Sequence, residues 1–201
     1  MPIFRNLQPC FLGFCLIISV STLQSLFVGQ WANPQDIPAY GWMTSVIRIT
    51  VFLGAAALSS RIATFSSHKI PLWAACILCT AGLALVMGTA CTGSSLPWLG
   101  ALHVVGLAIS AAGYALLYLY WIELYARMDL MHVIAYFALV HLLSATISLI
   151  VSSLPVRDLM FACIVCMPLI SSLLYTRSLR KSSDLPFMQG ETPSSGWSVP
   201  W

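Results

Sequence analysis

The stretch that decides the fold runs from Leu96 to Arg127 and reads LPWLGALHVVGLAISAAGYALLYLYWIELYAR. Between Leu99 and Tyr120 it contains no charged residue. About 20 apolar residues, each rising about 1.5 Å along a helix, are enough to cross the hydrocarbon of a membrane. This stretch is therefore predicted to be a transmembrane helix, and the other apolar segments are counted around it.

The two halves of this helix differ in composition. In the first half, Gly106 lies four residues before Ser110. Ala108 and Ala112 repeat the same spacing with small side chains, which let membrane helices approach closely. The second half contains the aromatic residues Tyr114, Tyr118, Tyr120 and Trp121. Such rings favour a membrane–water boundary, so this half is predicted to end near one.

The composition excludes an ordinary soluble domain. The chain has 201 residues, of which 59% are hydrophobic and 7% are charged. A soluble domain usually carries about a quarter of charged residues. The seven cysteines lie in or beside apolar runs, at positions 10, 15, 76, 79, 91, 163 and 166. Buried thiols are therefore expected in place of a secreted disulfide framework.

Six apolar runs are long enough to be membrane spans. They cover residues 10–29, 41–60, 71–90, 97–121, 131–153 and 156–176. The predicted fold is all-α and polytopic, with one six-helix transmembrane domain over residues 1–181. Residues 182–201 are rich in Ser, Pro and Gly, which is typical of a disordered tail, here expected in the cytoplasm.

The distribution of lysine and arginine predicts the orientation. One side of the predicted domain receives seven of the nine basic residues: Arg5, Arg61, Lys69, Arg127, Arg177, Arg180 and Lys181. The other side receives only Arg157, and Arg48 lies inside a span. Basic residues favour the cytoplasmic side, so both termini are expected there. Residues 10–29 also look like a signal peptide, but removing them would break this charge pattern, so an uncleaved anchor is preferred.

A weak internal repeat accompanies the six spans. The sequence ACILC at residues 75–79 matches ACIVC at residues 162–166. At the same offset, the Leu-Gly pair at residues 12–13 matches the pair at residues 99–100. Three spans would then correspond to the following three with the opposite membrane direction, as in an inverted repeat. Chance matches between apolar segments are the alternative explanation.

Six spans, both ends inside, a basic connection after the second span and a three-plus-three repeat together resemble one half of a major facilitator transporter. In that family, the loop after the second span carries Gly, Asp-Arg and a second Gly. Here the LSSR sequence at residues 58–61 and the pair His68–Lys69 keep the basic character without the Asp and the glycines. This departure counts against gradient-coupled transport.

The sequence GYALLYLYWIELYAR, residues 113–127, also resembles the membrane half of bacterial LuxR-type regulators. In those proteins a facilitator-like bundle is fused to a helix-turn-helix domain, and the resemblance here covers residues 1–181. It implies a bacterial inner-membrane protein with several spans. Too few residues follow Lys181 for a DNA-binding domain, so this chain is not expected to bind nucleic acid.

Arg48 is the most costly residue within a predicted span, at roughly 2.5–3.5 kcal/mol for a central position on insertion scales. It is expected roughly 10 Å below the outer boundary, and Gln24 and His103 fall at roughly the same depth on two other spans. Three polar side chains in one layer predict a site for a small anionic or strongly polar ligand. Alternatively, Arg48 extends to the outer headgroups or caps a carbonyl.

His141 lies near the middle of the fifth predicted span and is a further ligand-binding candidate. Ser144 and Ser148 follow it at spacings that put them on the same helical face. The facilitator resemblance implies that this span flanks a central cavity. The alternative is a histidine that is hydrogen-bonded to a neighbouring helix. Haem ligation by His103 and His141 is disfavoured, because their depths differ by roughly 6 Å.

Metal and enzymatic chemistry find little support. The pairs Cys76/Cys79 and Cys163/Cys166 could supply four zinc ligands. Both pairs lie in uninterrupted apolar helix, which disfavours the thiolate, so packing is preferred and neither metal nor cofactor is expected. The sequence lacks the nucleophile-elbow, zinc-protease and phosphate-loop motifs. Glu123 and Arg127, at a helix end, are predicted to form an interfacial ion pair.

The sequence therefore predicts a non-enzymatic membrane protein that senses or binds a small ligand. The alternative is a small-molecule transporter that acts as a homodimer or with a separate second half. Two copies with both ends inside can pair around an axis along the membrane normal, as facilitator halves do. An intramembrane enzyme is the least favoured of the three hypotheses.

Overall fold

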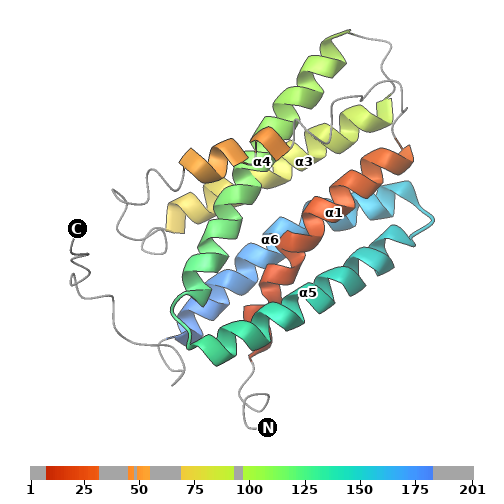
Figure 1. Cartoon of the computed structure of the whole chain (residues 1–201). Coiled ribbons are helices and arrows are strands. Elements are labelled where there is room, and N and C mark those ends of the chain that lie inside the picture. The colour runs from red at the N-terminus through yellow and green to blue at the C-terminus, as the bar shows by residue number, and fades with distance from the viewer. Residues whose placement is uncertain (1–7, 32–44, 48, 55–68, 93–96, 183–201) are drawn as a thin grey trace.

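The computed structural model describes residues 8–31, 45–47, 49–54, 69–92 and 97–182. Its elements are the 3₁₀-helix η2 (Pro9–Gly13) and the α-helices α1 (Phe14–Trp31), α3 (Lys69–Thr92), α4 (Pro97–Tyr125), α5 (Leu130–Ser152) and α6 (Arg157–Ser182) (Figure 1). Residues 45–47 and 49–54 are also helical. No strand occurs among the described residues, which confirms the all-α prediction.

Five of these helices are long and apolar enough to cross a membrane. They coincide with the predicted spans at residues 10–29, 71–90, 97–121, 131–153 and 156–176 to within a few residues at most ends. The chain thus has the helices of a multi-pass membrane protein. Most of the predicted span 41–60 lies outside the described residues, so the number six stays a prediction. The predicted tail also lies outside them, apart from Ser182.

The last helix continues further than the sequence predicts. α6 does not end at residue 176 but runs through Arg177, Arg180 and Lys181 to Ser182. Arginine and lysine are good helix formers, and positive charge is favourable beside the carbonyl end of a helix. Leaving the apolar region therefore did not end the helix here.

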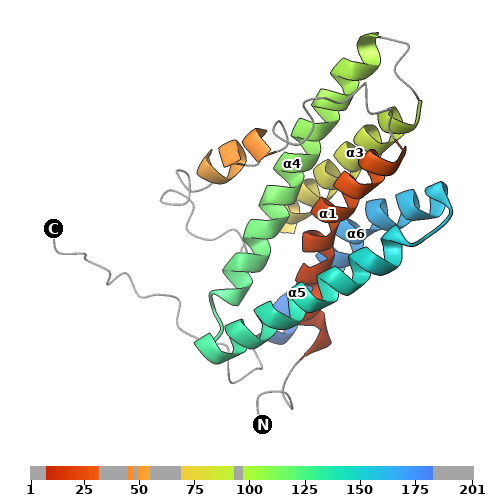
Figure 2. The same ribbon diagram turned by 45° about the vertical axis from the view of Figure 1, so that its right-hand side comes forward.

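The helices α1, α3 and α5 run in one direction, and α4 and α6 run in the other (Figures 1 and 2). The start of η2, the end of α4 and the end of α6 meet at one end of the bundle. Among the described side chains, this end holds the basic residues Arg127, Arg177, Arg180 and Lys181, and we call it the basic end. Arg157 begins α6 at the opposite end, so the described charges follow the predicted asymmetry.

The pair α3–α4 is packed backbone against backbone. A Cβ atom at Gly82 would collide with the backbone nitrogen of Ser110, and one at Gly113 would collide with that of Cys79. Gly106 also faces α3, where an added Cβ would lie 3.1 Å from a Val86 atom. The predicted close approach through Gly106 and Ser110 is confirmed. We call this contact, which contains Gly82, Gly106, Ser110 and Gly113, the glycine seam.

The second predicted pair of small residues does not belong to the glycine seam. Ala108 is exposed, and Ala112 is only half-buried. The reason is angular, because residues 106, 110 and 113 follow one face of the helix, whereas residues 108 and 112 lie round its side. Small residues at four-residue spacing occur on both faces of the helix, so this pattern does not predict which face contacts α3.

The aromatic residues of α4 face inward more than the boundary-belt prediction implies. Tyr120, Trp121 and Tyr125 are each 2% exposed or less. They meet rings from other helices, with the Trp121 and Tyr175 centroids 5.4 Å apart and the Trp121 and Phe14 centroids 6.0 Å apart. We call this group the aromatic cluster; its members are Phe14, Tyr120, Trp121, Tyr125, Tyr136 and Tyr175. Its rings hold helices together near the basic end.

Candidate functional site

Gln24 is the predicted site residue whose surroundings are the most unusual. It lies on α1 and is 2% exposed. Its Nε2 atom has no hydrogen-bond partner among the described residues. A buried amide donor without a partner costs roughly 1–3 kcal/mol relative to a bonded one. Such a group needs an explanation, and an acceptor supplied from outside the described residues is one.

His103 lies on α4, where it connects to α3. Its Nδ1 is 2.8 Å from the Oγ1 of Thr89. That hydroxyl also lies 2.8 Å from the Leu85 carbonyl oxygen, to which it donates. The same hydroxyl lies 2.9 Å from the Val86 carbonyl oxygen, so its contact with His103 Nδ1 is one of three that it makes. His103 therefore contributes a hydrogen bond to the α3–α4 pair.

Gln24 and His103 are brought to the same region of the bundle. Val28, one turn after Gln24, and Leu107, one turn after His103, belong to one buried cluster with Val86 and Ala90. This cluster joins α1, α3 and α4 at the end away from the basic end (Figure 1). The common depth that the sequence predicts for these two residues agrees with this arrangement.

The other two predicted site residues are not placed in that region. Arg48 lies outside the described residues. His141 is exposed on α5, and its ring lies 4.9 Å from the ring of Phe137. Ser144 and Ser148, which are expected on its face, are buried at 5% and 8% exposure. The structure thus separates the histidine from the serines in exposure, and a ligand-binding role of His141 stays a prediction.

A polar contact between α1 and α5 was not predicted from the sequence. Ser19, which is fully buried, donates from Oγ to Ser144 Oγ at 3.0 Å. Ser148, one turn further along α5, has a buried hydroxyl with no partner among the described residues. The sequence signal was the spacing of Ser144 and Ser148, which indicated a shared face but did not identify Ser19 as the partner.

The two Cys-x-x-Cys pairs lie in different environments. Cys76 and Cys79 are fully buried on α3, whereas Cys163 is half-buried and Cys166 is exposed on α6. All seven cysteines are free thiols. The described residues contain no group of three or more potential metal ligands. The two Cys-x-x-Cys pairs lie on α3 and α6, which run in opposite directions, as an inverted repeat requires. Any up-and-down bundle has this property, so the repeat stays a prediction.

Charged contacts outside the spans are local. Arg127 donates to Glu123 Oε1 at 2.7 Å, which confirms the predicted ion pair. Asp129 caps α5, because its Oδ1 accepts from the backbone N–H of His132 at 2.9 Å. This backbone hydrogen bond holds the pKa of Asp129 below its ordinary value, and the His132 side chain, 2.7 Å away, acts in the same direction. These groups close the turn between α4 and α5.

Comparison of the chain with protein-family models, with curated proteins and with solved structures found no match. The facilitator-like and LuxR-type resemblances therefore stay predictions that rest on the residues alone.

Proposed function

We propose that this chain is a six-span protein of the bacterial inner membrane that binds a small polar or anionic ligand. In this proposal both termini are cytoplasmic, the bundle is facilitator-like, and the protein is a sensor or binding module without enzymatic activity. The observation that carries the ligand proposal is the buried amide nitrogen of Gln24, which has no partner among the described residues.

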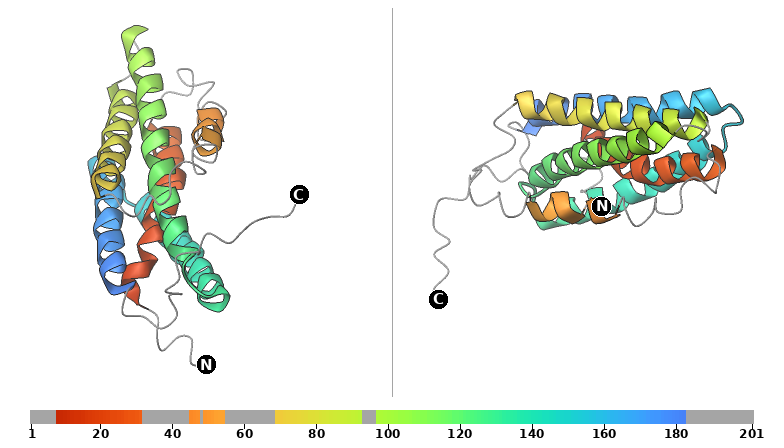
Figure 3. Two further views of the ribbon diagram at one scale, coloured as in Figure 1. Left: turned by 90° about the vertical axis from the view of Figure 1, so that its left-hand side faces the viewer. Right: turned by 90° about the horizontal axis from the view of Figure 1, so that it is seen from above.

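The directions of the helices support a further crossing between α1 and α3. These two helices run in parallel, so residues 32–68 connect opposite ends of the bundle. Ile47 packs on the cluster near the end of α1 that contains Val28 and Leu107. The ring of Phe52 lies 5.5 Å from the ring of Tyr118, nearer the basic end. The described residues of Ser45–Gly54 thus run in the direction opposite to α1 and lie beside α4, as a second span would (Figure 3).

The topology can be tested with reporter fusions after residues 35, 66, 94, 128, 155 and 185. The proposal expects the reporters to alternate between the outside and the inside, beginning outside. A reporter after residue 66 on the outside would contradict the crossing by residues 41–60. Cleavage near Ser21 would contradict the uncleaved anchor.

The ligand proposal places an acceptor opposite Gln24. An amide donor in a low-dielectric interior interacts strongly with an anionic acceptor, because little water competes for it. Ile47 belongs to the same contact as Val28 and Leu107, each one turn from a predicted site residue. The residue after Ile47 is Arg48, which we propose as the source of positive charge for the ligand.

A thermal-shift screen tests this site. The purified full chain, in detergent, is heated with members of a panel of water-soluble carboxylic acids. We expect at least one acid to raise the melting temperature of the wild type and to lose this effect in Gln24→Leu and in Arg48→Gln. Gln30→Leu is the matched control, because Gln30 is exposed on the same helix. Equal shifts in all four proteins, or no shift in any, would contradict the proposal.

Transport by a homodimer is a second candidate, and exposed His141 favours it. A histidine is unfavourable against lipid, and its neighbours Leu142 and Leu149 are 65% and 71% exposed. Among the five described spans, α5 buries the smallest share of its residues. A second copy on this face would cover His141. The mass of the protein in detergent distinguishes the candidates, since a strict monomer is incompatible with a dimeric transporter.

A further inference from the structure

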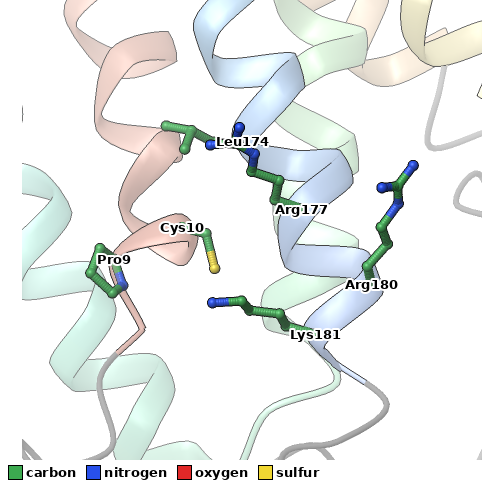
Figure 4. A pocket seen from close by; sticks show the side chains of 6 residues that line it. All are labelled: Pro9, Cys10, Leu174, Arg177, Arg180 and Lys181. Carbon is green, nitrogen blue, oxygen red and sulfur yellow. The ribbon is translucent and has the colours of Figure 1, made fainter.

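A pocket of ≈ 560 Å³ opens at the basic end, between η2 and the last turns of α6 (Figure 4). Its lining consists of Pro9, Cys10, Leu174, Arg177, Arg180 and Lys181. Half of these residues carry a positive charge, and none of them carries a negative one. The volume lies within the range of about 300–1,000 Å³ that is typical of small-molecule sites.

The cations of the pocket come from one stretch of α6. Arg180 and Lys181 follow Arg177 by three and four residues, a spacing at which like charges on a helix repel each other. Arg177 and Lys181 extend on the side of η2, whereas Arg180 leans the other way (Figure 4). Lys181 Nζ donates to Gln8 Oε1 at 3.3 Å, a neutral acceptor, and no ion pair of Lys181 occurs within the described part of the chain. An anion between Arg177 and Lys181 would relieve the repulsion.

The wall opposite these cations is held firmly by the other helices. Tyr125 donates from its hydroxyl to the Phe11 carbonyl oxygen at 2.6 Å. Ser171 donates to the Gly13 carbonyl oxygen at 2.9 Å, and the Gln8 backbone N–H donates to the Tyr136 hydroxyl oxygen at 2.8 Å. A ligand would therefore meet a preformed wall, which keeps the entropic cost of binding low.

An exposed apolar strip leads along α6 into the pocket. Leu173 and Ile170 lie four and seven residues before Arg177, on the same face of the helix. They are 51% and 47% exposed. A molecule with an acidic head and an apolar chain matches this surface better than a soluble anion, because both of its parts find complementary groups.

We propose that the pocket binds the phosphate group of an anionic phospholipid. Arg177 and Lys181 contact the phosphate oxygens, and an acyl chain lies along Leu173 and Ile170. Basic pockets at the cytoplasmic ends of transmembrane helices suit such headgroups. The helix dipole and the extension of long side chains toward water explain cations at this end of α6. They do not explain the pocket between α6 and η2 or the apolar strip that leads to it.

Native mass spectrometry of the full chain in detergent tests the proposal with phosphatidylglycerol, phosphatidylcholine and inorganic phosphate as probes. We expect the double variant Arg177→Gln/Lys181→Gln to bind phosphatidylglycerol about thirty-fold more weakly than the wild type, because each cation contributes about fivefold. Phosphatidylcholine, whose choline cation offsets its phosphate charge, should bind the wild type more weakly and lose less in the double variant. Arg157→Gln, at the opposite end, is the matched control and should bind phosphatidylglycerol as the wild type does.

Folding of the variants is checked by their melting temperatures in phosphatidylcholine, and Arg177→Lys keeps the charge and should keep most of the binding. Equal affinity of the wild type and the double variant for phosphatidylglycerol would overturn the proposal. Equal affinity of the wild type for the two lipids would overturn it as well. Inorganic phosphate that binds as tightly as phosphatidylglycerol would identify a soluble anion as the ligand and overturn the lipid assignment.

Discussion

The glycine seam and the aromatic cluster hold the same helix, α4, by different means. In the seam, α4 touches α3 through backbone atoms, and the residues Gly82 and Gly113 leave no room for a side chain. In the cluster, α4 touches α6 and α1 through large rings, and Trp121 Nε1–H donates to Ser171 Oγ at 3.0 Å. Van der Waals packing of small residues and interhelical hydrogen bonds are two main sources of helix association in membranes. The residues of the glycine seam use the first, and the aromatic cluster adds the second through Trp121 and Ser171.

The two contacts are therefore sensitive to different kinds of substitution. At Gly82 and Gly113 the seam tolerates no added atom, because the opposing surface there is backbone that cannot move without displacing the helix. The cluster tolerates changes in shape better but depends on satisfied hydrogen bonds, because a polar group left alone in an apolar interior costs free energy. Added volume should therefore damage the seam, and removed polar atoms should damage the cluster.

The largest effect is expected from Gly82→Leu in the glycine seam. The new side chain would collide with the backbone of Ser110 and force α3 away from α4. We expect a loss of about 3 kcal/mol or more in the free energy of unfolding in micelles, at the upper end for overpacking. Gly88→Leu is the matched control on the same helix, because nothing lies within 4 Å of a Cβ there. Equal losses in the two variants would show that the close approach is not what stabilises this pair.

A smaller loss is expected from Ser171→Ala in the aromatic cluster. The Ser171 hydroxyl accepts from Trp121 and donates to the Gly13 carbonyl oxygen, so its removal leaves two buried polar groups without this partner. Each such group costs roughly 1–3 kcal/mol, and we expect about 2 kcal/mol in all after local relaxation.

The neighbouring residue supplies the control for this experiment. Ser172 is buried to the same degree, but its hydroxyl donates to the Pro168 carbonyl oxygen of its own helix. Ser172→Ala should therefore change the free energy of unfolding by less than about 1 kcal/mol. A Ser172→Ala loss as large as that of Ser171→Ala would show that the hydrogen bonds from α4 through Ser171 to η2 stabilise the fold no more than a hydrogen bond within one helix does.

The glycine seam and the aromatic cluster also show which features of the fold can be predicted from the sequence. The seam could be anticipated, because Gly106 and Ser110 lie at the spacing that membrane helices use for close approach. Its partner residue Gly82 could not, since a spacing on one helix does not identify the helix opposite. The aromatic residues of α4 were visible, but their direction was not: Tyr120 and Trp121 suit a membrane boundary and a packed interior equally well by composition.

The candidate site was predictable only in part, for a related reason. The depth of Gln24 and His103 follows from counting residues along a helix, and the structure brings their neighbours Val28 and Leu107 together. The hydrogen-bond partner of each polar side chain cannot be found by counting residues. Thr89, the partner of His103, is one of many hydroxyl residues in the chain. Which of them faces His103 depends on how α3 is rotated about its axis relative to α4, and the sequence does not determine this rotation.

The α1–α5 contact offers an intermediate case, with one pair of rings, Phe14 and Phe137 at 6.4 Å, and a separate hydrogen bond between hydroxyls further along the two helices. Ser19 Oγ donates to Ser144 Oγ at 3.0 Å and also lies 2.8 Å from the Cys15 carbonyl oxygen. A double-mutant cycle with Ser19→Ala and Ser144→Ala should give a coupling free energy of about 0.6 kcal/mol, the average for such bonds between membrane helices. Unfolding in micelles provides the measurement. A coupling as large as the Ser171→Ala loss would mean that a buried hydroxyl can be important without a hydrogen bond to a ring.

The smallest effect is expected at Asp129, in the turn that joins α4 to α5. The backbone N–H of His132 holds the pKa of Asp129 below its ordinary value, so the carboxylate stabilises the fold above that ordinary value. This contribution is lost as the pH falls through the lowered pKa. Asp129→Asn keeps an acceptor oxygen and gains no proton. The melting temperature of the wild type should therefore fall more steeply on acidification than that of the variant.

Asp158→Asn is the control, because the Asp158 side chain is 86% exposed at the opposite end, and its curve should follow the wild type. Parallel curves for the wild type and Asp129→Asn would show that the ionised Asp129 side chain does not contribute to the stability of the turn.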